Sequence, residues 1–140
     1  MNWLIYGILA MIAYALFNFF VKLSSNKINV PLAVGIISLT AAIVGFIIFG
    51  YLKITNQNII YSTDGLKFVI LAGIFVSLAE LFYYFMFIEK VNLSIGLPLV
   101  VGGTIAIGSI LGVIFLSESL TAYQIFGIIF TLMGIILLSI

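Results

Sequence analysis

Glu80 is the residue whose type and position are best suited to chemistry in this chain. It lies near the middle of an apolar segment that runs from Leu66 to Ile88. If this segment crosses a membrane, a charge at its centre costs about 2.5–3.5 kcal/mol on insertion scales, so the carboxyl should face protein or water. The functional interpretation is a carboxyl that exchanges a proton or binds a cation. The alternative is a protonated, hydrogen-bonded glutamic acid that only packs.

Polar side chains accompany Glu80 at helical spacing. Ser77, Glu80 and Tyr84 follow the spacing i, i+3, i+7 and would share one face of a helix. In the first apolar segment, Tyr14 and Asn18 are four residues apart and would also share a face. Such stripes either line a path or form hydrogen bonds between helices, worth about 0.6 kcal/mol each. We predict that these five residues line a substrate or proton path, and interhelical hydrogen bonding remains the equal alternative for Tyr14 and Asn18.

Other kinds of chemistry are excluded by the residues that the sequence lacks. The chain contains no Cys, no His and no Arg. It therefore offers no disulfide or thiolate metal site, no histidine base and no bidentate phosphate clamp. The net charge of +1 suggests no nucleic-acid partner. Without a Ser/His/Asp set, a metal-ligand cluster or a phosphate-binding loop, we expect neither an enzyme nor a bound metal or cofactor.

The composition indicates that these residues lie on helices that cross a membrane. Of the 140 residues, 65% are hydrophobic and 6% are charged, whereas a soluble domain is about 45–50% apolar and about 25% charged. The chain is therefore predicted to be an integral membrane protein. Its apolar segments approach the roughly 20 residues that cross a hydrocarbon core of about 30 Å. We predict an all-α bundle in a single domain, residues 1–140, with transmembrane helices at 3–21, 30–52, 66–88, 93–116 and 121–138.

The orientation in the membrane is weakly specified. Five spans place the termini on opposite sides, and one side carries Lys22, Lys27 and Lys90. The other side carries Lys53 and Lys67 in addition to the terminal amino group. Orientation follows an excess of lysine and arginine on the cytoplasmic side. Two readings stay open: the one-lysine bias selects an outward N-terminus, or the chain inserts both ways.

Small residues recur in the last two segments. Gly108 and Gly112 are four residues apart, and Gly127 and Gly134 are seven apart. Such spacing lets helix backbones approach closely. We predict helix packing at these glycines, within the chain or between subunits. Pro98, which lacks a backbone donor, predicts a kinked start to the fourth helix.

Three residues at segment ends have structural roles in this interpretation. Lys22 is expected to extend toward the lipid headgroups. Glu118 is expected to cap or flank the turn before the last helix. Thr121, or Ser119 just before it, is a suitable N-cap for that helix.

Several of these features occur in an order that is similar to one family. The third segment ends in aromatic residues (FYYFMFIEKVNLS), and Pro98 follows early in the fourth segment. The turn Ser-Glu-Ser-Leu-Thr at 117–121 looks like a Gly-Glu-Arg-Leu-Thr turn, with Ser117 and Ser119 in place of Gly and Arg. A glycine-spaced final segment (GIIFTLMGIILL) completes the pattern. The whole chain thus resembles an EamA domain of the drug/metabolite transporter superfamily.

This resemblance implies transport of small metabolites or drugs across the cytoplasmic membrane. Long members of the family carry two such domains in opposite orientation, with the substrate cavity between them. A chain with one domain is therefore expected to form a homodimer, in an antiparallel arrangement that rebuilds the inverted repeat. The Gly127 and Gly134 pair also resembles the glycine heptad of small multidrug resistance proteins, which dimerise through their last helix.

The function predicted from the sequence is alternating-access transport. Glu80 would exchange a proton against the substrate or bind a cation. One carboxyl in an apolar, aromatic path favours a cationic or zwitterionic amphiphile as substrate. The alternative is a membrane scaffold subunit that does not transport, or half of a heteromeric lipid-carrier flippase.

Overall fold

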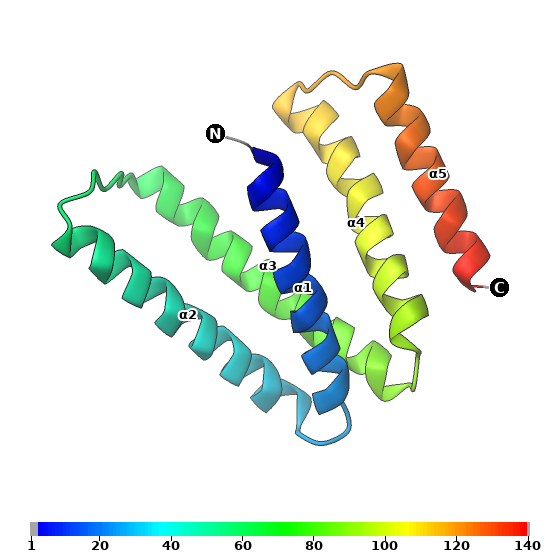
Figure 1. Ribbon diagram of the computed structural model, residues 1–140, viewed down its shortest axis with the longest axis horizontal. Coiled ribbons are helices and arrows are strands. Elements are labelled where there is room, and N and C mark those ends of the chain that lie inside the picture. The colour runs from blue at the N-terminus through cyan, green and yellow to red at the C-terminus, as the bar shows by residue number, and fades with distance from the viewer. Residues whose placement is uncertain (1–2, 140) are drawn as a thin grey trace. The chain divides into compact units, whose positions relative to one another are not determined.

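The computed structural model describes residues 3–139, which form five α-helices without any strand (Figure 1). In chain order the helices are α1 (Trp3–Ser24), α2 (Val30–Ile54), α3 (Thr63–Ile88), α4 (Leu93–Leu116) and α5 (Ala122–Ser139). The predicted all-α architecture is confirmed.

The lengths and surfaces of the helices fit a lipid environment. Helices α1 to α4 contain 22, 25, 26 and 24 residues and are apolar and long enough to cross a membrane. Helix α5 is shorter, at 18 residues, or about 27 Å at 1.5 Å per residue. Most large hydrophobic side chains are exposed on the isolated chain. Water would penalise such a surface, whereas lipid tails cover it without cost.

The four connections share one backbone feature that ends the preceding helix. A residue with positive φ occurs in each: Asn26 at 62°, Asn56 at 55°, Lys90 at 64° and Ser117 at 56°. A left-handed residue after the last helical turn lets the following amides bond to the last carbonyls. After α2, for example, the amide of Gln57 donates to the carbonyl of Leu52 at 3.0 Å. Helices α1 and α2 therefore continue beyond their predicted ends, until the backbone turns.

Two helices begin at side-chain caps. Ser62 Oγ accepts a hydrogen bond of 2.9 Å from the amide of Gly65, so α3 begins three residues before the predicted start. At α5, the Thr121 amide donates to Gln124 Oε1 at 2.7 Å, and the Gln124 amide donates to Thr121 Oγ1 at 3.3 Å. This reciprocal pair is a capping box. Thr121, rather than Ser119, is thus the N-cap of the last helix.

The helices fall into two compact units. The first unit comprises Met1–Lys22 and Glu89–Ile140, and the second comprises Leu23–Ile88. In the second unit, α2 and α3 pack as an antiparallel hairpin (Figure 1). The buried side chains of this hairpin lie in the N-terminal part of α2 and the C-terminal part of α3: Val30, Ala33, Val34, Tyr83, Tyr84 and Phe87. The core of the second unit therefore lies at the end of the hairpin nearest its connection to α1.

In the first unit, α4 and α5 form a second antiparallel hairpin (Figure 1). The helices approach closely at Gly102, which is buried. A Cβ atom added there would overlap Ile135 Cδ1 and would lie 2.9 Å from Ile135 Cγ1. Helix α4 continues through Pro98, which lies inside the helix. The absence of a side chain at Gly102 thus permits the close contact between α4 and α5.

Candidate functional site

Glu80 lies within the membrane-spanning length of α3. It precedes the helix end at Ile88 by eight residues, or about 12 Å along the axis. The side chain is partly buried, and its Oε2 atom is buried without a hydrogen-bond partner among residues 3–139. Helix α2, which packs against α3, carries no ionisable side chain between Val30 and Gly50. Glu80 is therefore an intramembrane carboxyl that no basic residue of its packing partner neutralises.

Tyr83 is the second polar group of this site. Its side chain is 7% exposed, and its hydroxyl is the other buried atom with no hydrogen-bond partner in the described chain. The spacing of i, i+3 places it one helical turn from Glu80. The ring of Tyr83 packs edge-on against Phe87, with centroids 4.7 Å apart. Packing fixes the ring, while its buried hydroxyl has no hydrogen-bond partner among the described residues.

Sequence reasoning missed Tyr83 and selected its neighbour Tyr84. The i, i+3 spacing from Glu80 was a signal that could have found Tyr83. Tyr84 is 2% exposed, and its hydroxyl lies 2.8 Å from Ser24 Oγ, within hydrogen-bonding distance. This contact joins α3 to the end of α1. Tyr84 thus has a partner inside the second unit, whereas Tyr83 has none there.

Ser77 also bonds within the protein. Its hydroxyl donates to the carbonyl of Gly73 in the preceding turn of α3, at 2.9 Å. Ser77, Glu80 and Tyr84 therefore lie on one helix, as their spacing requires, but only Glu80 among them presents a buried unpartnered atom.

The two residues predicted on α1 belong to the first unit. Asn18 is 8% exposed, and its Nδ2 donates to the carbonyl of Tyr14 at 2.6 Å. The Tyr14 side chain is mostly exposed, and its ring meets Phe17 edge-on. The Asn18 amide therefore satisfies its own helix, and Tyr14 faces outward from the isolated chain.

Lys22 makes a contact that its sequence position did not indicate. Its ammonium donates to the carbonyl of Val91 at 2.6 Å. Val91 precedes α4, so this hydrogen bond ties the last turn of α1 to the start of α4 within the first unit. Lys22 therefore has a packing role in addition to the expected position near the headgroups.

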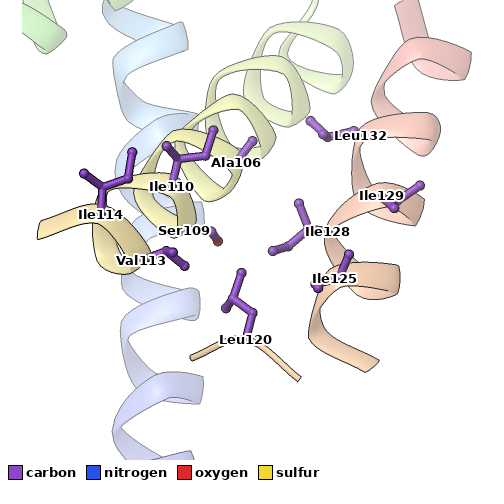
Figure 2. A pocket seen from close by; sticks show the side chains of 10 residues that line it. All are labelled: Ala106, Ser109, Ile110, Val113, Ile114, Leu120, Ile125, Ile128, Ile129 and Leu132. Atoms are coloured by element: carbon purple, nitrogen blue, oxygen red, sulfur yellow. The ribbon is translucent and has the colours of Figure 1, made fainter. Parts of the chain in front are cut away.

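A groove of about 350 Å³ lies between α4, α5 and their connecting turn (Figure 2). Side chains from both helices and Leu120 from the turn face it (Figure 2). Ser109 is the one polar residue in its lining, and the Ser109 hydroxyl already donates to the carbonyl of Ile105 at 2.8 Å. The groove offers no free polar group to orient a ligand, so it suits hydrocarbon rather than a polar substrate.

The predicted packing glycines differ in their surroundings. A Cβ atom added at Gly108, Gly127 or Gly134 would meet no atom of residues 3–139 within 4 Å. At Gly112 it would lie 3.2 Å from Cδ of Glu118, because the Glu118 side chain folds back over the end of α4. The Glu118 amide also donates to the carbonyl of Gly112. Gly112 thus accommodates the turn that Glu118 flanks, and the other three glycines are open.

Long apolar helices with an ionisable group inside one span define a multi-pass membrane protein with a polar intramembrane site, the kind that marks substrate and ion pathways. The chain belongs to the EamA-like transporter family, whose profile matches residues 1–140. The chain is also 31% identical over 139 residues to an uncharacterized protein of Methanocaldococcus jannaschii, a match that covers 98% of this chain and 96% of that protein. No solved structure matches it. The resemblance noted in the sequence is confirmed: this is a membrane transporter of the drug/metabolite superfamily, a family of transporters rather than enzymes.

Proposed function

We propose that this chain is a secondary transporter of a small metabolite or drug-like molecule, and that Glu80 couples transport to a proton or another cation. The observation that carries this proposal is the unpartnered Glu80 Oε2 inside a membrane-spanning helix. An ionised carboxyl at this depth is costly, and binding of a proton or cation removes the cost. A single carboxyl that both a proton and a substrate can occupy makes their binding competitive, and this competition links their movements.

The active form in this proposal is a homodimer in the cytoplasmic membrane that works by alternating access. Two antiparallel copies of one five-helix domain would form an inverted repeat, with the substrate site between the repeats. The nearly balanced lysines support insertion in both orientations. The open positions Gly108, Gly127 and Gly134 support close approach by a second copy, because no described residue fills them.

The other four predicted path residues would contact a substrate only under particular conditions. Ser77, Asn18 and Tyr84 each hydrogen-bond within the protein. They would contact a substrate only in a state in which those bonds exchange. Tyr14 is exposed on the isolated chain and would have to meet the path from the dimer surface.

The test is proton flux in liposomes that contain the purified chain alone. Candidate substrates are first chosen by thermal-shift screening. Wild-type protein should then transport substrate across the liposome membrane when an imposed pH gradient drives it. Glu80→Gln preserves size but cannot titrate, so it should fold and dimerise normally and lose pH-driven transport. Glu89→Gln is the matched control, because Glu89 is exposed just beyond the end of α3. Normal proton-coupled flux in Glu80→Gln would remove Glu80 from the mechanism.

The competing function is a scaffold subunit or half of a heteromeric flippase. On that view the chain alone would transport nothing, and flux would appear only with a partner polypeptide. The same liposomes distinguish the two functions, because substrate-dependent flux by the chain alone is expected only for a self-sufficient transporter.

A further inference from the structure

We propose that Tyr83 is a ligand-binding residue, and that with Glu80 it selects protonated primary or secondary amines over quaternary ammonium ions. This inference rests on the proposed transport function and specifies its substrate class. The two groups are one helical turn apart on α3, and each has a buried oxygen without a partner in the described chain.

The contrast between two consecutive tyrosines shows why Tyr83 is distinctive. Both rings are buried, at 7% exposure for Tyr83 and 2% for Tyr84. The Tyr84 hydroxyl pairs with Ser24 Oγ, whereas the Tyr83 hydroxyl has no partner. Buried tyrosine hydroxyls normally find a partner, since an unsatisfied one costs about 1–3 kcal/mol. A ligand that supplies the missing hydrogen bond would remove this cost.

The chemistry of the pair defines what that ligand must offer. An ionised Glu80 carboxyl only accepts hydrogen bonds, and a phenol hydroxyl can also accept one. A protonated primary or secondary amine carries at least two N–H donors, so it can bond to both oxygens while its charge neutralises the carboxyl. A quaternary ammonium ion neutralises the charge but has no N–H and leaves the Tyr83 oxygen unsatisfied. Packing against Phe87 limits how far the Tyr83 ring can move to compensate.

Two matched cations test this selectivity: hexylammonium and hexyltrimethylammonium, which share charge and chain length. Their binding to the full chain in lipid nanodiscs is measured by calorimetry. Wild-type protein should bind hexylammonium roughly tenfold more tightly than hexyltrimethylammonium, the difference expected for one charge-assisted hydrogen bond. Tyr83→Phe keeps the stacked ring and should bring the two affinities within about twofold, by weakening hexylammonium alone.

Tyr51→Phe is the control, because it removes the same atom from an exposed tyrosine near the end of α2, outside the proposed site. It should leave the ratio of affinities unchanged. Three results would overturn the inference: an unchanged ratio in Tyr83→Phe, an equal loss for both cations, or no saturable binding of either cation by wild-type protein. An equal loss would mean that Tyr83 acts only by positioning Glu80. Glu80-dependent proton flux is a separate readout, so the proposed transport function can stand if the amine selectivity fails.

Discussion

Gly102→Ala should destabilise the α4–α5 hairpin through a single methyl group. The added Cβ would overlap Ile135 Cδ1, lie 2.9 Å from Ile135 Cγ1 and lie 3.8 Å from Thr131 Cγ2. The atom that must move is the flexible end of a side chain, so the helices need not separate. An off-rotamer side chain costs about 0.5–1.5 kcal/mol, and overpacking of a filled site costs about 1–3 kcal/mol. We expect a loss of about 1–2 kcal/mol in the free energy of unfolding.

Gly103→Ala supplies the matched control, because no atom lies within 4 Å of a Cβ added at that position. This variant should raise the free energy of unfolding by about 0.5–1 kcal/mol, because glycine in a helix interior is less favourable than alanine by that amount. Both variants are measured by reversible unfolding in mixed micelles with increasing dodecyl sulfate. Ile135→Ala removes the atoms in conflict, so adding Gly102→Ala to that background should cost far less than in wild type.

Two outcomes would refute this account of the contact. Equal stability of Gly102→Ala and Gly103→Ala would mean that Ile135 moves away freely. An unreduced cost of Gly102→Ala in the Ile135→Ala background would mean that the methyl group conflicts with something other than this side chain.

Three further predictions concern a turn, the dimer and the topology. Ser117→Gly should raise the free energy of unfolding by about 0.5–1 kcal/mol, because Ser117 holds φ 56° and ψ 32°, where glycine has no Cβ penalty; unchanged or lower stability in the same unfolding assay would contradict this. If the chain forms the proposed homodimer through its last helix, Gly134→Leu should weaken that dimer without preventing membrane insertion, as measured by crosslinking in membranes. An unchanged crosslinked dimer would move the interface elsewhere, with Gly108 the next position to test. A single cysteine introduced at Asn58, between α2 and α3, should react with impermeant maleimide from both sides of the membrane, since the chain has no cysteine of its own. Labelling from one side only would exclude dual topology.

The helices could be predicted because the bilayer sets a length that hydropathy reveals directly. Helix α4 occupies Leu93–Leu116 in the structure, the same residues as its apolar segment. The helix ends were harder to predict where a lysine interrupts an apolar segment. Lys22 and Lys53 do not stop their helices, because the backbone of a lysine stays helical while its long side chain reaches a polar partner. For Lys22 this partner is the Val91 carbonyl, and an exposed lysine such as Lys53 can reach water. Those ends depend on the left-handed residues Asn26 and Asn56 further along the chain.

The sequence by itself determined the all-helical membrane fold and the family, because composition and hydrophobic length depend on residues that are neighbours along the chain. Only the tertiary structure distinguished Tyr83 from Tyr84 and Gly102 from Gly103. Each pair has identical residue types at consecutive positions, and both tyrosines lie about one helical turn from Glu80, so helical spacing alone does not choose between them. The Tyr84 hydroxyl has a partner because Ser24, sixty residues earlier, packs beside it, and Gly102 must stay small because Ile135 of α5 fills the space above it. Hydrogen bonding and close packing depend on atoms that only folding brings together.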